Sequence, residues 1–357
     1  MAETKLDQDS IAGYDFSLPR ELIAQQPVEH RIDARLMLVD RESGTIDHRY
    51  VRDLPEIFEA GDALVLNDSK VIAARLVGKR TSTGGKWEGL LLRTDESSGV
   101  CELLSKTRGN LTAGETLSLR DREGRELPAL SVVSKLEGGH LAVRPIDMDE
   151  NQLVEKFGRV PLPPYIRDGQ MVDTDVTSYQ TVYAKHPGSV AAPTAGLHFT
   201  KDLIRHLQSK GVFTAAVTLH VGLGTFKPVS AEKLSEHKMH LESGELTEQS
   251  AAKLRHCREN GGRVIAVGTT STRVLESAAQ STGVAFQPWQ GETDIFIRPP
   301  YEFLAMDALM TNFHLPKSTL LALVSAFAGH ELTMKAYAEA IEQRYRFYSY
   351  GDCMLIL

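Results

Sequence analysis

Four segments of the chain combine polar side chains and glycine directly after apolar runs that are typical of strands. Ligands of α/β sheets bind outside the carboxyl ends of the strands, so these segments are the first candidates for a site. They are Ala191–Thr200, Thr218–Phe226, Gly268–Arg273 and Thr311–Pro316.

Three of these segments contain a histidine between apolar neighbours: His198, His220 and His314. A half-buried imidazole can have a pKa near neutrality, so each is a candidate general acid or base. The alternative for each is a core histidine whose ring is hydrogen-bonded to a backbone carbonyl. Their presence in three comparable loops favours the catalytic interpretation.

The segment that begins at Gly268 precedes a predicted helix. Free backbone N–H groups and the hydroxyls of Thr269 and Thr270 can bind a carboxylate or phosphate there, although a simple N-cap explains them equally well. Gly222 and Gly224 lack the third glycine of a dinucleotide fingerprint, and no Walker sequence is present. The sequence therefore gives little support for NAD or ATP binding.

Two carboxylates, Asp294 and Asp307, lie beside apolar, strand-like runs. An acid in such a position needs a partner or a cationic ligand, and aromatic residues close to Asp294 in the sequence can help to bind a sulfonium. A salt bridge to Arg298 or Arg273 is the alternative. His237 and His240 have a spacing that can hold a metal, but a third ligand is missing nearby, which favours a solvated turn.

Near the carboxyl end, cations alternate with aromatic residues: Arg344, Arg346, Tyr348 and Tyr350. This composition is typical of a surface that stacks on bases and contacts phosphates. The alternative is a set of core aromatic rings with arginines that extend to the surface.

The elements around these residues are of two kinds. Residues 67–152 contain short β-type runs separated by glycine turns, which predict a small all-β barrel. Residues 1–66 and 153–357 alternate strand-like and helical segments, with Thr200, Thr247 and Ser318 as expected helix starts. The predicted fold is an α/β layered domain, a mixed sheet with helices, that carries the barrel as an insertion.

Composition limits the class of protein. The 357 residues are enough for about two domains. The net charge of −7 argues against a general polyanion binder, so any contact with nucleic acid needs a local basic patch. Three widely spaced cysteines exclude a disulfide framework and a four-cysteine zinc site. The N-terminus is polar, and the longest apolar run is too short to span a bilayer. These two features predict a cytoplasmic protein without membrane spans.

A larger set of segments carries a resemblance to one family. These segments are Leu162–Ile166, Tyr179–Ala184, Gly188–Thr200, Thr218–Phe226, Ile265–Arg273, Thr311–Leu321 and Tyr345–Asp352. They resemble the S-adenosylmethionine:tRNA ribosyltransferase-isomerases of queuosine biosynthesis, and the similarity extends from Asp15 to Leu357. The chain departs from the family pattern at Ala73, Thr272 and Pro300, without loss of a histidine, aspartate or arginine of these segments.

The resemblance implies an α/β domain with an inserted β-barrel. It also implies that the ribosyl part of S-adenosylmethionine moves onto 7-aminomethyl-7-deazaguanine at the tRNA wobble position. Isomerisation gives epoxyqueuosine-tRNA, and adenine and methionine leave. S-adenosylmethionine is then a co-substrate, tRNA is the partner, and no metal is expected. We expect a monomer.

The chemistry of this reaction suggests roles for the candidates. A C–H beside a sulfonium is acidified, so a neutral histidine can remove the ribose 5′ proton. The expected catalytic residues are His198, His220, His314, Asp294 and Asp307. The expected co-substrate-binding residues are Thr194, Gly196, Gly222, Gly224, Thr269, Thr270, Arg273 and Asn312. The expected RNA-binding residues are Arg344, Arg346, Tyr348 and Tyr350.

Two other functions are compatible with parts of this pattern. A non-catalytic tRNA-binding protein would use the barrel and the Arg-aromatic segment, but it would not need all three loop histidines. A methyltransferase would also bind S-adenosylmethionine, but the glycine-rich acidic loop usual in that class is missing.

Overall fold

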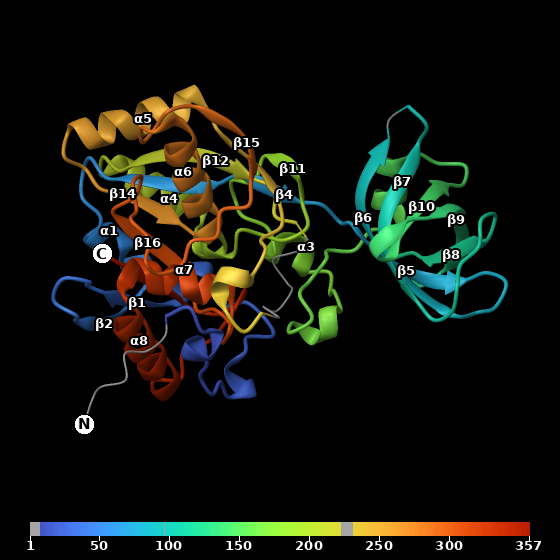
Figure 1. Ribbon diagram of the computed structural model, residues 1–357, viewed down its shortest axis with the longest axis horizontal. Helices are drawn as coiled ribbons and strands as arrows, with labels where there is room; N and C mark the ends of the chain where they lie inside the picture. Colours follow the sequence, from blue (N-terminus) through green and yellow to red (C-terminus); the bar gives the residue numbers. More distant parts are fainter. Residues whose placement is uncertain (1–7, 96, 223–230) are drawn as a thin grey trace. The chain divides into compact units, whose positions relative to one another are not determined.

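The computed structural model describes residues 8–95, 97–222 and 231–357. The chain divides into two compact units (Figure 1). Unit 1 comprises Met1–Val71, Pro164–Asp168 and Val176–Leu357, and unit 2 comprises Ile72–Pro163 and Gly169–Asp175.

The limits of unit 2 follow from local pairing. Strand β4 (Ser69–Val71) pairs in parallel with β11 (His186–Ser189), and both strands belong to unit 1. Beyond residue 152, the backbones of Arg75 and Arg159 exchange two hydrogen bonds of 3.0 and 2.8 Å, which tie residue 159 to unit 2. The expected limits of 67 and 152 for the inserted barrel domain stay a prediction.

Unit 1 is built on a nine-stranded mixed sheet in the order β15-β13-β12-β3-β14-β16-β17-β1-β2. Its four central strands, β12, β3, β14 and β16, are all parallel. The strands are β1 (Arg35–Val39), β2 (Ile46–Tyr50), β3 (Ala63–Asn67), β12 (Phe213–Leu219), β13 (Glu242–Leu246), β14 (Val264–Val267), β15 (Trp289–Thr293), β16 (Ala308–Asn312) and β17 (Cys353–Ile356).

Helices cover both faces of this sheet (Figure 1). One face packs against α5 (Glu248–Glu259), α6 (Thr269–Thr282), α7 (Thr319–Ala328) and α8 (His330–Glu342). The other packs against α1 (Leu54–Ile57) and α4 (Lys201–Ser209). Because both faces are buried, the central strands β3 and β14 are nearly continuous apolar runs rather than alternating ones. The short helix α3 (Asp175–Ser178) lies where the two units join in sequence.

Three helices, α4, α5 and α7, begin where the sequence predicts. The side chains of Thr200, Thr247 and Ser318 accept hydrogen bonds from the backbone N–H groups of Leu203, Ser250 and Leu321. Each bond satisfies one donor that the first turn of a helix leaves without an acceptor.

Unit 2 is a closed antiparallel barrel in the order β10-β7-β6-β5-β8-β9, which confirms the predicted all-β barrel. Its strands are β5 (Arg75–Arg80), β6 (Lys86–Asp95), β7 (Val100–Thr107), β8 (Thr116–Arg120), β9 (Glu126–Lys135) and β10 (His140–Pro145). Helix α2 (Glu150–Phe157) follows, with Asp149 in a capping box with Gln152. The predicted fold class is therefore confirmed.

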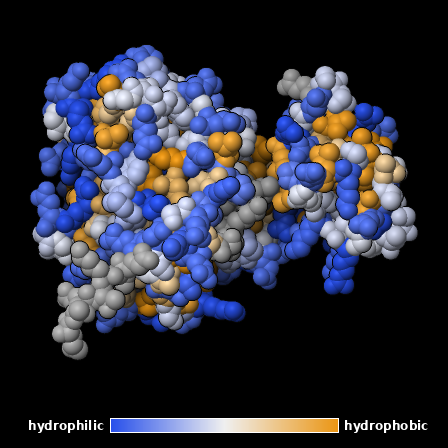
Figure 2. Space-filling model, in the orientation of Figure 1, coloured by the Kyte–Doolittle hydropathy of each residue, from blue (hydrophilic) through white to orange (hydrophobic). Residues whose placement is uncertain are grey.

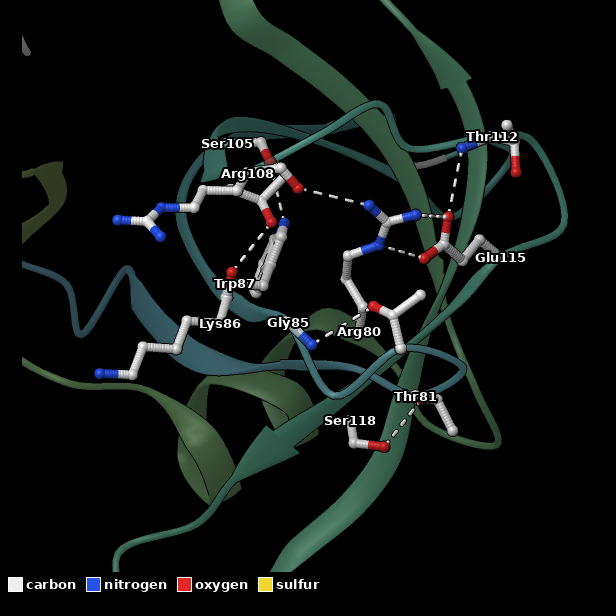
Figure 3. A network of polar contacts seen from close by, with 12 residues as sticks. Arg80, Thr81, Gly85, Lys86, Trp87, Ser105, Arg108, Thr112, Glu115 and Ser118 are labelled. Carbon is white, nitrogen blue, oxygen red and sulfur yellow. Dashed lines mark hydrogen bonds and ion pairs between the residues drawn. The ribbon is translucent and has the colours of Figure 1, made fainter.

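Trp87 and the Arg80–Glu115 pair organise one part of the barrel (Figure 3). The indole N–H of Trp87 donates to Ser105 Oγ at 2.8 Å. A Cβ atom at Gly89 would lie 2.3 Å from the Trp87 ring, so only glycine fits there. Arg80 donates to both carboxylate oxygens of Glu115, at 2.5 and 2.9 Å, and both side chains are largely buried.

Ion pairs lie at the amino edge of the parallel strands in unit 1. Arg263 donates from Nη2 to Asp62 Oδ2 at 2.6 Å, and Asp62 is 2% exposed. Arg258 donates to Asp307 Oδ1 at 2.9 Å, and the backbone N–H of Val264 donates to Asp307 Oδ2 at 2.7 Å. These contacts join the starts of β3, β14 and β16.

The described helices include none that is long and apolar enough to span a bilayer. The face of the molecule in Figure 2 is mainly hydrophilic, with hydrophobic residues in small groups. Four of the exposed large hydrophobic residues, Leu127, Val133, Leu136 and Val172, belong to the barrel unit.

The Arg80–Glu115 pair should stabilise the barrel. Glu115→Gln leaves a largely buried guanidinium without its counter-charge, so we expect the free energy of unfolding to fall by about 1–3 kcal/mol at pH 7. Urea titration in a Trp289→Phe background, where Trp87 is the remaining tryptophan, measures the change. The control is Glu123→Gln, because Glu123 and its partner Arg125 are both exposed.

The same pair predicts a pH dependence. The hydrogen bond from Arg80 holds the pKa of Glu115 below its usual value. The pair's contribution is therefore complete above the unfolded-state pKa of about 4.3 and is lost as the pH falls through the folded-state pKa. The difference between parent and Glu115→Gln should shrink at pH 3. An equal difference at pH 3 and pH 7 would contradict this assignment.

Candidate functional site

The carboxyl ends of the four parallel strands lie at one edge of the sheet. The strands end at Leu219, Asn67, Val267 and Asn312, in their order across the sheet. The parallel pairing brings together three of the predicted segments, those that follow β12, β14 and β16. The fourth, Ala191–Thr200, follows β11, which pairs with β4 outside this sheet.

A cavity of about 460 Å³ lies at this edge and receives residues from all four predicted segments. Its volume is in the range of small-molecule sites. The residues from these segments are Ala191–Ala195, Val221, Gly268–Thr270 and Thr311–Pro316. The rest of the wall is formed by Pro164, Tyr165, Tyr179, Lys317–Leu320, Tyr348 and Ser349.

The starts of two helices, α6 and α7, line this cavity. Gly268 has φ of +87°, a conformation that favours glycine, and its N–H donates to Met310 O at 2.7 Å. Helix α6 then begins at Thr269. The first N–H groups of a helix have no intrahelical acceptor and carry partial positive charge, so this end of the cavity favours an anion. Thr270 Oγ1 is buried here without a hydrogen-bond partner among the described residues.

His314 lies in the cavity wall and is 9% exposed. Its Nε2 is 2.8 Å from Thr311 Oγ1, and its backbone N–H donates to the Tyr337 hydroxyl at 2.9 Å. No group of the described residues hydrogen-bonds to Nδ1, which leaves that nitrogen for a ligand. Burial lowers the pKa of His314 to about 3, so the ring is neutral at physiological pH.

His198 lies behind the cavity wall, at the end of the 3₁₀ helix Thr194–His198. The side chain is 4% exposed, and its Nε2 is 3.1 Å from Nδ2 of Asn312, a wall residue. Burial lowers the pKa of His198 to about 3. Thr194 belongs to the wall, whereas Gly196 packs under Tyr183: a Cβ atom there would lie 2.0 Å from the Tyr183 hydroxyl.

His220 follows β12 and is half-buried beside Gly188, outside the set of wall residues. A Cβ atom at Gly188 would lie 2.8 Å from His220 Nδ1, which is buried and has no hydrogen-bond partner among the described residues. Burial, then the nearby His186, lower the pKa of His220, and Asp68 opposes them. Three strand spacings separate the ends of β12 and β16, about 14 Å, so the sheet does not place His220 directly beside His314.

Neither of the two predicted acids belongs to the cavity wall. Asp294 follows the edge strand β15 and is exposed. Asp307 precedes β16 at the opposite edge of the sheet, in the ion pair with Arg258. The length of β16 separates it from Asn312 by about 17 Å.

Arg273 is buried in an ion pair with Glu242 on β13. Glu242 also accepts a hydrogen bond from the backbone N–H of Gly222 at 2.9 Å. The carboxylate neutralises the guanidinium that the sequence assigns to a ligand, and the pair instead ties α6 to the loop after β12. Gly224 lies outside the described residues.

The Arg-aromatic segment is only partly at the surface. Arg344 is exposed. The rings of Tyr348 and Tyr350 are buried, with centroids 4.6 Å from Tyr165 and 5.8 Å from Tyr179, respectively. The half-buried Arg346 donates from Nη2 to the carbonyl of Gln26, and its backbone N–H donates to Asp352 Oδ2 at 2.8 Å.

Several residues of the cavity wall were not predicted from the sequence. Tyr165, Tyr179 and Lys317 line the cavity without having been assigned to it, and Tyr348 lines it although it was assigned to RNA. Tyr165 and Tyr179 both lie in segments that carry the family resemblance, which is the signal that could have identified them. In the residues that the structure describes, no cluster of three potential metal ligands occurs.

The comparisons with known proteins agree over nearly the full length of the chain. A family described as "Queuosine biosynthesis protein" matches residues 11–356. An S-adenosylmethionine:tRNA ribosyltransferase-isomerase of Symbiobacterium thermophilum is 50% identical, over 97% of this chain and 99% of its own. The enzyme of that name from Caldanaerobacter subterraneus subsp. tengcongensis is 48% identical, over 96% of this chain and 98% of its own.

Similarity to a solved structure covers both units. The crystal structure of S-adenosylmethionine tRNA ribosyltransferase from Thermotoga maritima has 38% sequence identity and a TM-score of 0.55. The match covers 97% of this chain and 100% of that one. From this similarity and the family match over residues 11–356, the chain belongs to the S-adenosylmethionine:tRNA ribosyltransferase-isomerase family of queuosine biosynthesis.

Proposed function

We propose that this enzyme transfers and isomerises the ribosyl part of S-adenosylmethionine onto 7-aminomethyl-7-deazaguanine at the tRNA wobble position. Epoxyqueuosine-tRNA forms, and adenine and methionine are released. The observation that carries the proposal is the cavity at the carboxyl edge of the sheet in unit 1, which is lined by the starts of α6 and α7, Asn312 and His314. The family match gives this cavity its expected co-substrate.

The cavity has features suited to the parts of S-adenosylmethionine. The methionine carboxylate is placed at the start of α6, where the first backbone N–H groups have no intrahelical acceptor. Thr270 Oγ1 there has no hydrogen-bond partner within the described part of the chain. In this assignment the start of α6 binds the carboxylate, and Arg273 does not, because Arg273 is paired with Glu242. The tyrosines and apolar residues of the wall suit the nucleoside.

His314 is the proposed proton acceptor. The sulfonium acidifies the ribose 5′ C–H, and a neutral imidazole lies in the wall, with no described residue hydrogen-bonded to its Nδ1. The low pKa makes His314 a weak base, so proton transfer depends on the acidity that the sulfonium confers on the C–H. The expected acid–base role of His220 and the electrostatic roles of Asp294 and Asp307 rest on the sequence pattern alone.

The tRNA partner is proposed to contact the exposed part of the Arg-aromatic segment, with Arg344 as its accessible cation. The net charge of −7 requires such contacts to be local. A monomer, a cytoplasmic location and metal-independent activity belong to the same proposal.

Product analysis tests the function. The protein is incubated with S-adenosylmethionine and tRNA that carries the deazaguanine precursor, and the small molecules are separated by chromatography. We expect adenine and methionine in equal amounts, with tRNA lacking the precursor as the control. S-adenosylhomocysteine would instead identify a methyltransferase. Binding of tRNA without either set of products would identify a non-catalytic tRNA-binding protein.

His314→Gln should lower kcat by at least about 10²-fold, because general acid–base groups contribute about 10²–10⁴-fold. Steady-state adenine release measures the loss. His256→Gln is the matched control, because His256 is exposed on α5, outside the cavity wall. A loss below about threefold would remove His314 from the acid–base set.

The pH profile gives a second test of His314. Its pKa of about 3 keeps the base form present at every pH above that value. His314 should therefore add no inflection to kcat/KM between pH 5 and 8, whatever other groups titrate there. An inflection near pH 6.5 in the parent that disappears in His314→Gln would contradict the neutral, buried state.

Thr270→Val tests the carboxylate position. Loss of the unpaired hydroxyl should raise KM for S-adenosylmethionine about tenfold or more and leave kcat within about threefold, because the hydrogen bond is to a charged group. Thr282→Val, at the other end of α6, is the control. An unchanged KM in Thr270→Val would place the carboxylate elsewhere.

A further inference from the structure

Asn312 presents an unpaired acceptor at the wall of the cavity. It is the last residue of β16, is 2% exposed and lines the cavity. Its Oδ1 is buried and has no hydrogen-bond partner among the described residues. A buried amide oxygen without a donor is costly, so its presence in a cavity wall indicates a donor supplied by the ligand.

Two backbone carbonyls fix which way the Asn312 amide points. Nδ2 lies 3.2 Å from Tyr348 O and 3.4 Å from Asp352 O. Carbonyl oxygens only accept, so the NH₂ end must face them and Oδ1 must point elsewhere. The amide oxygen is therefore the polar end left for a ligand.

The same orientation determines the protonation of His198. Its Nε2 lies 3.1 Å from Nδ2 of Asn312, which is a donor, so Nε2 must be an unprotonated acceptor. The surroundings favour the same state: burial lowers the pKa of His198, and the cations of Arg31 and Arg346 lower it further. A nitrogen that is already engaged as an acceptor from Asn312 is not free to exchange protons with a substrate.

We propose that His198 is a positioning residue that holds Asn312 so that Oδ1 accepts a hydrogen bond from the 6-amino group of the adenine of S-adenosylmethionine. This inference rests on the proposed function. The 6-amino group of adenine is an uncharged donor, so it can reach a buried amide oxygen without placing a charge beside the positive ends of α6 and α7. Tyr165 and Tyr348 supply aromatic wall beside the amide, as a planar base requires.

A co-substrate with altered hydrogen bonding tests the recognition step. S-inosylmethionine carries a carbonyl oxygen where S-adenosylmethionine carries the amino group, so it would oppose the Asn312 oxygen with a second acceptor. We expect the parent enzyme to prefer S-adenosylmethionine by about 10²-fold or more, both in calorimetric binding and in kcat/KM. In Asn312→Ala the preference should fall below about fivefold, because the selecting oxygen is absent.

Two substitutions of His198 separate positioning from acid–base catalysis. In His198→Gln, Oε1 can take the place of Nε2 as the acceptor, so kcat and the preference for S-adenosylmethionine should stay within about fivefold of the parent. In His198→Leu the acceptor is lost, so KM and the preference should change by about tenfold or more while kcat changes less. Circular dichroism and thermal unfolding identify any variant that fails to fold.

The outcomes distinguish this inference from the proposed function. A loss of kcat of about 10²-fold or more in folded His198→Gln would make His198 an acid or base and overturn the positioning role. An unchanged preference in folded Asn312→Ala would overturn adenine recognition. If the parent binds S-adenosylmethionine selectively but releases no adenine, the proposed reaction fails and the recognition step stands.

Discussion

The hydrogen bond from Gly268 N–H to Met310 O is the contact on which the site depends. It continues the parallel pairing of β14 and β16 one step beyond the last paired residues, Val267 and Met310. The register therefore fixes where α6 begins relative to Asn312. With φ of +87° at Gly268, the chain leaves the strand and enters the helix without an intervening loop. The Gly268–Met310 hydrogen bond thus places the positive end of α6 and the side-chain amide of Asn312 beside each other at the carboxyl edge of the sheet.

The polar groups around the cavity are held mainly by other buried groups. Thr311 contacts His314, and Asn312 contacts His198, so each histidine is paired within the protein. Burial keeps both rings neutral, and the charge of Arg273 is balanced by Glu242. The site is consequently a cavity of dipoles with few free charges. Such a site needs little reorganisation when charge moves during a reaction.

Local sequence signals predicted much of the fold and part of the site. Helix caps such as Thr200 and Ser318, and the glycine-punctuated strands of the barrel, depend on near neighbours and are readable from the chain. The segments after β12, β14 and β16 were found because the carboxyl ends of parallel strands meet at one edge of a sheet. Contacts with distant strands could not be predicted from the sequence. Glu242 neutralises Arg273 although 31 residues separate them in the chain. The register of β14 and β16 places Asp307 at the amino edge of the sheet, opposite the cavity. Burial of Tyr348 and Tyr350 is likewise a tertiary property.

The separation of the two sheet edges has a consequence for protein engineering. The Asp62–Arg263 and Asp307–Arg258 pairs join the strand starts, about 17 Å from the cavity along β16. Free-energy effects of substitutions more than about 10 Å apart usually add. Thermal stability can therefore be raised by redesign of the amino edge while substrate selectivity is evolved at the carboxyl edge. The two libraries can be screened separately and then combined.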